Sequence, residues 1–189
     1  DWFEVYDFIE ITLVYLPSAL PKKYKVTFTT LINRALEREN SAYRIINDQI
    51  IEITSAQEIQ SIEEALENTG IYSGVQQHLN QALKLMSDRQ NPDYRNSIKE
   101  SISAVEALAM KILEDNSITL GKAIPRLRTK YRLHPTLMES LNKLYGYSSD
   151  ENRVRHGSPE ESSISYIDAK FMLIACTNFI NYLIEKTKD

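Results

Sequence analysis

Hydrophobic residues recur every three or four positions along most of the chain, which is the spacing of a helix with one buried face. Pro17 and Pro21 follow the first such stretch, and we expect these prolines to end a first helix. A second helix is expected over about residues 22–39. Ser55 and Glu58 have the spacing of a capping box, which predicts the start of a helix that ends near residue 70. The positions that define the first helix are Trp2, Tyr6, Ile9, Leu13 and Leu16.

In one short segment the spacing of the hydrophobic residues is no longer that of a helix. Residues 42–46 and 49–53 are rich in isoleucine, and they flank Asn47 and Asp48, which tolerate the positive φ of a tight turn. The segment therefore predicts a β-hairpin. Two strands alone are marginally stable, so we expect this hairpin to lean on the helices.

After residue 70 the pattern is helical throughout. Asn91 is expected to cap a helix whose first residue is Pro92. Pro125 either bends a helix over residues 119–131 or marks its true start, and Pro135 opens the next helix. The predicted core positions are Val75, Leu79, Ala82, Met86, Ile98, Ile102, Val105, Ala109, Ile112, Leu120, Ile124, Leu127, Tyr131, Leu137 or Met138, Leu141 and Leu144.

A long apolar helix closes the chain. Ser158 and Glu161 have capping-box spacing, and the last helix is expected to run from there to about Lys186. Residues 171–184 are apolar on nearly every side, which favours burial against several partners at a bundle centre or a dimer seam. Three polar residues interrupt the run, whereas a membrane span needs roughly 20 mostly apolar residues. We therefore expect a core helix and no membrane segment. The interrupting residues are Thr177, Asn178 and Asn181.

The elements together predict a mainly α fold. An N-terminal region of helices and a small β-hairpin covers residues 1–70, and a four-helix bundle with an inserted basic helix covers residues 71–189. We expect the two regions to form one compact unit. A chain of 189 residues buries enough surface to fold without a disulfide or a metal. No signal peptide is visible, which favours a cytoplasmic location.

The charge is uneven along the chain. The net charge is −4, but residues 121–158 carry eight basic and three acidic side chains, a balance of +5. Lys122, Arg126 and Lys130 lie at four-residue spacing and share one side of the predicted basic helix. Such a row is suited to phosphates of RNA or a nucleotide, although a solvated helix face has the same pattern.

Few residues are suited to metal or cofactor chemistry. The only cysteine, Cys176, lies in an apolar run and is expected to be a buried, inert thiol. The three histidines are far apart, so a metal site is not expected, and the chain has no glycine-rich phosphate loop. We expect no cofactor. Of the histidines, His78 is interpreted as structural and His134 as a helix cap.

The polar loop over residues 150–156 is the main candidate site. A histidine such as His156 transfers protons near neutral pH, and the guanidinium groups of Arg153 and Arg155 suit phosphate. The alternative is that the arginines pair with Asp150 or another carboxylate and only fix the loop. Glu106, at the edge of an apolar stripe, is placed to pair with an arginine from another helix, as a structural or a supporting residue.

Several stretches resemble the AbiJ-type N-terminal domain of bacterial abortive-infection proteins, which is similar to the HEPN superfamily. They are residues 96–107 (NSIKESISAVEA), 119–124 (TLGKAI) and 144–157 (LYGYSSDENRVRHG), with residues 2–7 (WFEVYD) and 91–96 (NPDYRN). The resemblance implies a four-helix bundle that forms a homodimer, with the loop before the last helix facing its copy. Active members of the superfamily are metal-independent ribonucleases of anti-phage and toxin systems.

The motif of those ribonucleases is an arginine, usually followed by a polar residue, and a histidine four to six positions after the arginine. His156 matches the histidine, and Asn152 stands as the polar member. Arg153 and Arg155 are both closer to His156 than the motif requires, so the assignment of the arginine is open. Two hypotheses follow: an RNA-cleaving dimer that uses this loop, or a non-catalytic module for dimerisation, regulation or binding.

Overall fold

The computed structural model describes residues 2–19, 21–39, 41, 43–53, 55–70, 72–88, 90–149 and 164–188. Within these residues the fold is mainly α, as predicted, with eight helices and one two-stranded hairpin. The chain divides into two compact units, residues 1–63 (unit 1) and residues 64–189 (unit 2), and each is described by itself. The domain limits expected from the sequence, 1–70 and 71–189, stay a prediction.

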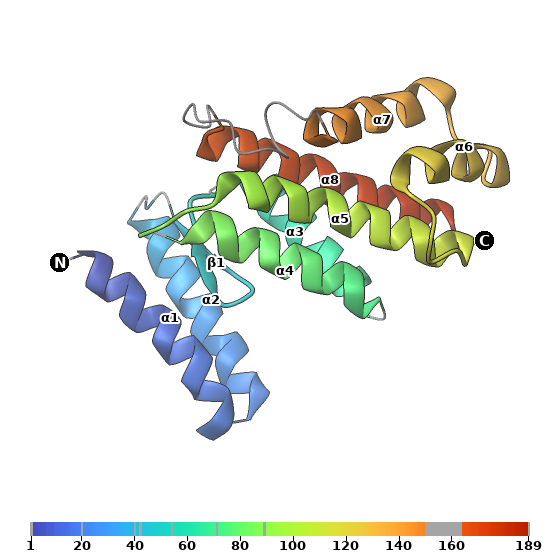
Figure 1. Cartoon of the computed structure of the whole chain (residues 1–189). Helices are drawn as coiled ribbons and strands as arrows, with labels where there is room; N and C mark the ends of the chain where they lie inside the picture. Colours follow the sequence, from blue (N-terminus) through green and yellow to red (C-terminus); the bar gives the residue numbers. More distant parts are fainter. Residues whose placement is uncertain are drawn as a thin grey trace. The chain divides into compact units, whose positions relative to one another are not determined.

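Unit 1 consists of two helices and the hairpin. α1 (Trp2–Ala19) packs against α2 (Lys22–Arg38) as a helical hairpin (Figure 1). The expectation that Pro17 ends the first helix is wrong, because α1 continues to Ala19. Proline at position 17 removes one backbone hydrogen bond of α1, and the helix continues for only two residues beyond it. Pro21 is the N-cap residue of α2 and makes no side-chain cap hydrogen bond.

The predicted hairpin is confirmed. β1 (Arg44–Ile46) pairs antiparallel with β2 (Gln49–Ile51), with Ile45 opposite Ile50. Asn47 and Asp48 have φ values of 47° and 69°, as a tight turn between twisted strands requires. The hairpin packs into a core with residues of both helices. That core contains Ile9, Leu13, Ile45 and Ile50, with Tyr6, Phe28, Ile32 and Tyr43 around it.

Side chains from the helices bond to both outer edges of the hairpin. The Asn33 side chain of α2 donates to the Ile45 carbonyl (2.9 Å) and accepts from the Ile45 N–H (2.7 Å). Glu10 of α1 accepts from the Ile50 N–H of β2 (2.8 Å). These bonds satisfy backbone groups that an isolated hairpin leaves to water, and they explain how strands of three residues are stable here.

Unit 2 is organised around one central helix. α5 (Tyr94–Leu113) packs against α4 (Ser73–Ser87), α6 (Leu120–Lys130), α7 (Pro135–Ser149) and α8 (Tyr166–Lys186) (Figure 1). α4 also contacts α8, and α6 contacts α7. α3 (Ala56–Asn68) contains the boundary between the units, and its predicted cap is present, since Ser55 accepts from the Glu58 N–H (3.4 Å). The predicted core positions of α4, α5 and α6 are buried, except that Ile112 and Tyr131 are half-buried.

The start of α5 differs from the expectation. Asp93, not Asn91, is the N-cap, and its carboxylate accepts from the Asn96 N–H (2.9 Å). Pro92 therefore precedes the helix instead of opening it. An aspartate three residues before a free helical N–H is as good a cap as asparagine, and the sequence contains both, two positions apart.

α8 is the core helix that the apolar run predicted. It begins at Tyr166 with a capping box formed by Ser165 and Asp168, and hydrogen bonds from Ser165 lower the pKa of the Asp168 carboxyl. The start expected at residues 158–161 lies outside the described residues. By length and composition alone α8 also qualifies as a membrane span, but buried residues recur along its whole length. Cys176 is buried among them, and burial raises the pKa of its thiol to about 12.

Candidate functional site

The main predicted site lies outside the described residues. This applies to Asp150, Asn152, Arg153, Arg155 and His156, so the convergence of their side chains stays a prediction. The described chain stops at Ser149 in α7 and resumes at Ile164 before α8. The structure does describe the other predicted site residues, which lie on α5 and α6.

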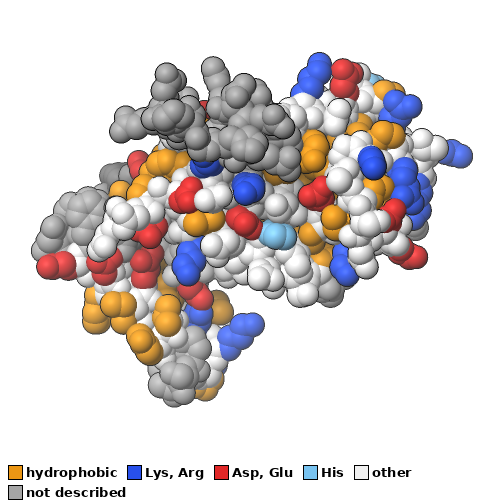
Figure 2. Space-filling model, viewed as in Figure 1, with side chains coloured by type: hydrophobic (Ala, Val, Ile, Leu, Met, Phe, Trp, Pro, Cys, Tyr) orange, Lys and Arg blue, Asp and Glu red, His pale blue; other side chains and the backbone are white. Residues whose placement is uncertain are grey.

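α6 presents a row of basic side chains opposite its buried face. Leu120, Ala123, Ile124 and Leu127 are buried, so residues four apart on the other side of the helix are exposed. Pro125 lies inside α6 and is not its start. We call Lys122, Arg126 and Lys130 the α6 basic surface; Figure 2 shows Lys and Arg side chains gathered where Figure 1 places α6.

Arg126 is held by an ion pair at the end of α5. Its Nη1 donates to Oδ2 of Asp115 (2.7 Å). Asp115 also accepts from the backbone N–H and the hydroxyl of Ser117 (3.2 and 2.9 Å). These hydrogen bonds, from Ser117 first and then from Arg126, lower the pKa of the Asp115 carboxyl. The carboxylate therefore stays charged and orients one guanidinium edge, while about half of the Arg126 side chain remains exposed.

Lys130 lies one turn further along α6. Its Nζ donates to the carbonyl of Ile112 (3.3 Å), near the negative end of the α5 dipole, and lies 5.2 Å from the Tyr131 ring centre. Arg126 and Lys130 share a surface pocket of about 480 Å³ with Leu113, Pro125 and Thr129. The structure thus brings two predicted phosphate-binding residues to one concave site.

Lys122 differs from its two neighbours in the row in the contacts of its side chain. The side chain is exposed and forms no hydrogen bond or ion pair within the described part of the chain. It lies four residues from Arg126 on the same side of α6, one turn nearer the N-terminus. The row is therefore partly fixed by α5 and partly open to a ligand.

Glu106 anchors the other end of α6. Its Oε1 accepts from the backbone N–H of Leu120 (2.8 Å), the first residue of that helix. The pairing with an arginine that the sequence suggested is not present among the described residues. The carboxylate instead satisfies one of the free N–H groups at a helix start and so positions α6 on α5.

Sequence reasoning missed an imidazole–carboxylate pair between α4 and α5. Nδ1 of His78 lies 2.7 Å from Oε2 of Glu100, and both side chains are partly exposed. Nothing in either stretch of sequence connects these residues, because the pair depends on the crossing of two helices. The proposed side-chain cap by His134 is not observed; its backbone carbonyl accepts from the Met138 N–H instead (3.2 Å). Within the described residues, no group of three or more His, Cys, Asp and Glu is arranged to hold a metal.

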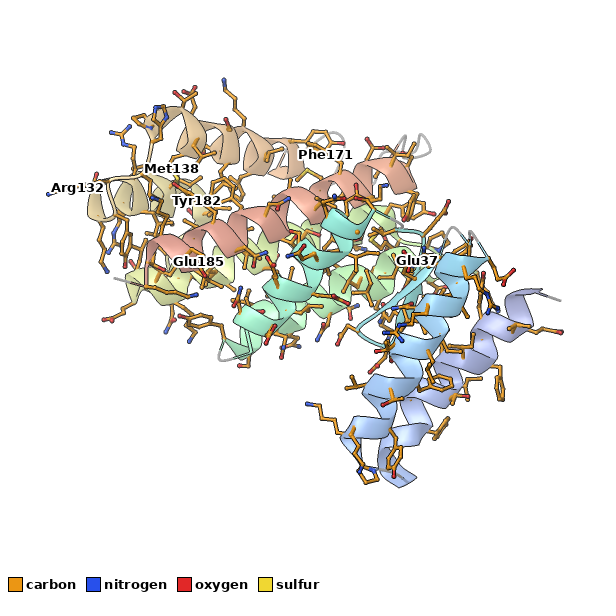
Figure 3. All side chains as sticks on the ribbon, turned by 180° about the vertical axis from the view of Figure 1, so that it is seen from behind. Glu37, Arg132, Met138, Phe171, Tyr182 and Glu185 are labelled. Atoms are coloured by element: carbon orange, nitrogen blue, oxygen red, sulfur yellow. The ribbon has the colours of Figure 1, made fainter. Side chains whose placement is uncertain are left out.

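A second pocket, of about 560 Å³, lies between α7 and α8. Its walls are mainly apolar, with Lys143 and Asp168 as charged members, and Phe171 lies on α8 beside the end of α7 (Figure 3). No local pattern in the sequence marks this pocket, because Phe171 is exposed but belongs to an apolar run of which most residues are partly or fully buried. The remaining lining residues are Ser140, Leu144, Tyr147 and Met172.

Comparison with known families gives one match. Residues 1–68 match the family model described as AbiJ N-terminal domain 4. Over these residues, about a third of the chain, the protein is similar to an AbiJ-type N-terminal domain. The domain includes α1, α2, the hairpin and α3, and it contains residues 2–7, which carried part of the resemblance. No curated protein and no solved structure gives a significant match.

The match suggests that residues 1–68 are an abortive-infection-related domain. The other stretches of the resemblance, from residue 91 onward, lie outside the matched residues. Membership of unit 2 in the HEPN superfamily therefore does not follow from the match, and it enters below as part of a proposal.

Proposed function

We propose that this chain acts in abortive infection as an RNA-binding module, with the α6 basic surface as the contact for the RNA backbone. The observation that carries the proposal is the exposed row of Lys122, Arg126 and Lys130 on a helix without acidic residues. The row lies in a chain whose net charge is −4, so its positive potential is local. Local positive potential concentrates a polyanion at one place instead of along the whole protein.

The geometry of the row suits a run of phosphates. Residues four apart on a helix are separated by about 6 Å along its axis, so three of them follow a backbone over roughly 12 Å. The planar donors of Arg126 fit a phosphate, and Asp115 fixes their direction before RNA arrives. Because contacts to phosphate carry no sequence information, we expect binding with little preference for base sequence.

Binding is tested by its dependence on salt. Each phosphate neutralised in a single strand contributes roughly −0.7 to the slope of log K against log salt concentration. We expect Lys122→Ala to weaken binding of single-stranded RNA and to reduce the magnitude of that slope by about 0.7. The measurement is fluorescence anisotropy with labelled oligonucleotides at several salt concentrations.

Lys84→Ala is the matched control, since Lys84 is also an exposed helical lysine of unit 2. It should leave affinity and slope unchanged. Equal losses for the two variants would mean that RNA responds to net charge alone, and this would contradict a site on α6.

We further propose that RNA bound in this way is cut without a metal, in a homodimer of HEPN-like units in the cytoplasm. His156 removes the proton from a ribose 2′-hydroxyl, and the 2′-oxygen attacks the adjacent phosphorus while the 5′-oxygen leaves with a proton. Arg153 or Arg155 stabilises the charge that develops on the phosphate oxygens. Support comes from the residue types of this segment and from their resemblance to the superfamily motif.

Cleavage is tested with His156→Ala and RNA in the presence of a chelator. We expect the wild-type protein to cut RNA with excess EDTA present, and the variant to lose at least 100-fold in rate, as removal of a general base predicts. Melting temperature and RNA affinity should be unchanged. Undiminished cleavage by the variant would exclude His156 as the base, whereas binding without cleavage by the wild type would favour the non-catalytic module.

A further inference from the structure

α1 carries two apolar sides, and unit 1 buries only one of them. Ile9 and Leu13 are buried in the core of the unit. Val5, Phe8 and Tyr15 lie on another side of the helix, with 56%, 68% and 68% of their surface exposed. On the face shown in Figure 2, hydrophobic side chains gather over α1. Soluble proteins rarely leave a contiguous apolar stripe on a helix without a partner.

The exposed stripe has the spacing of a helix-packing seam. Val5, Phe8, Thr12 and Tyr15 are separated by three, four and three residues, which is the pattern that keeps one side of a helix against another helix. The Thr12 hydroxyl donates to the Phe8 carbonyl within the helix (2.7 Å), so Thr12 adds no unmet donor to the stripe. The partner that this spacing fits is a second helix. We call these four residues the α1 seam.

The charges around the seam indicate which helix that partner is. Glu4, Asp7 and Glu10 lie near the start of α1, which has no Lys or Arg between residues 2 and 19. At the opposite end of the helical hairpin, α2 begins with Lys22 and Lys23. A surface that is acidic at one end, apolar in the middle and basic at the other is complementary to its own copy turned through 180°.

From this arrangement we propose that α1 packs antiparallel against α1 of a second copy of this chain. The two-fold axis passes near the middle of the seam, so the acidic end of each α1 lies beside Lys22 and Lys23 of the other copy. Tyr24 and Leu31 of α2, the helix that packs against α1, are exposed and seven residues apart, so they lie on one side of α2. Lys23 Nζ lies 5.1 Å from the Tyr24 ring centre, which keeps a positive charge at that edge.

This surface differs from the dimer of HEPN-like units proposed above, and the two do not depend on each other. One helix with part of its neighbour makes a small interface, so we expect reversible association that depends on concentration. An anionic membrane or a nucleic acid fits the seam poorly, because α1 itself offers no positive charge.

Sedimentation equilibrium of the full chain over a range of concentrations tests the seam. We expect Phe8→Glu to halve the assembled mass, or to raise the dissociation constant at least tenfold, with an unchanged circular dichroism spectrum. Val14→Glu is the control: Val14 is equally exposed (64%), but it lies roughly 140° around α1 from the seam. It should assemble as the wild type does. Equal masses for wild type and Phe8→Glu at every concentration would overturn the proposal.

Charge reversal tests the antiparallel arrangement and remains informative if Phe8→Glu fails to fold. Glu4→Lys with Asp7→Lys should weaken self-association, and so should Lys22→Glu with Lys23→Glu, because each variant brings like charges together. A mixture of the two double variants should associate at least tenfold more tightly than either alone. A mixture that associates no better than its components would show that the copies do not meet in this way.

Discussion

Glu106 shows how one carboxylate connects two helices. Its single hydrogen bond to the Leu120 N–H lies at the start of α6, where backbone donors have no acceptor within the helix. Leu120 is completely buried, so water does not easily replace the carboxylate. The negative charge also lies at the positive end of the α6 dipole.

Replacing Glu106 should therefore destabilise the fold around α6. We expect Glu106→Ala to lower the free energy of unfolding by about 1–3 kcal/mol, the usual effect of leaving a buried donor unpaired. Glu106→Gln retains an acceptor and should lose less than half as much. Urea denaturation measures both values. Similar losses for the two variants would mean that the charge, and not the hydrogen bond, is the important feature.

Residue-level partners were the least predictable part of the candidate site. The sequence placed Glu106 at the edge of an apolar stripe and Lys130 in a basic row. The partners of these side chains are backbone groups, the N–H of Leu120 that donates to Glu106 and the carbonyl of Ile112 that accepts from Lys130. Backbone groups are present at every position, so no residue type marks the one that will be used. The His78–Glu100 pair was missed for a related reason, because neither residue is unusual in its own helix.

The hairpin of unit 1 is stabilised by side chains of neighbouring helices. Asn33 bonds both backbone groups of Ile45, which is fully buried, and thereby takes the place of a third strand on that edge. Lys25 of the same helix pairs with Asp48 in the turn. α2 therefore fixes β1 at its turn and at its outer edge.

Asn33→Ala removes both bonds to Ile45 and leaves a buried donor and a buried acceptor. We expect it to lower the free energy of unfolding by about 2–4 kcal/mol, since each unmet group costs about 1–3 kcal/mol. Hydrogen exchange at the Ile45 amide should become faster. Arg34→Ala changes the next residue of α2, which is exposed, and should have little effect on either measurement. An unchanged exchange rate in Asn33→Ala would contradict the role of Asn33.

Turns and helix caps, which depend on neighbouring residues, could be predicted from the sequence. Hydrogen bonds between residues far apart in the sequence could not. The turn was predictable because Asn47 and Asp48 must themselves adopt positive φ. The caps at Ser55 and Asp93 are both local features. For α5, however, Asn91 and Asp93 were both possible N-cap residues, and the sequence alone did not distinguish between them. The bond from Asn33 to Ile45 spans twelve residues and depends on how α2 lies on the strand, which no local pattern encodes.

At the scale of the whole molecule, the period of the hydrophobic residues determined the fold class. α4 to α6 each bury the predicted stripe, because a helix in a bundle must hide one side and expose the other. The run over residues 171–184 identified the core helix α8 in the same way. The spacing of hydrophobic residues carries no information on how a polar loop folds, so the arrangement of residues 150–156 stays a prediction.

The distribution of charged residues along the chain distinguishes two kinds of surface. α6 has four basic residues and no acidic one, whereas α1 has three acidic residues and no basic one. A net charge of −4 would by itself exclude neither an RNA partner nor a second copy of the chain. The positions of the charges along individual helices are what distinguish a phosphate-binding row from a self-complementary seam.

The burial of Cys176 has a practical consequence for spectroscopy. Its thiol is the only one in the chain, and with a pKa of about 12 it stays protonated under ordinary labelling conditions. A cysteine introduced at an exposed position, such as Lys122 or Val14, would then be the single reactive thiol without any change to the native one. Maleimide dyes or nitroxides on one such cysteine would report distances between copies, and a pair of cysteines, one in each unit, would report distances between the two units.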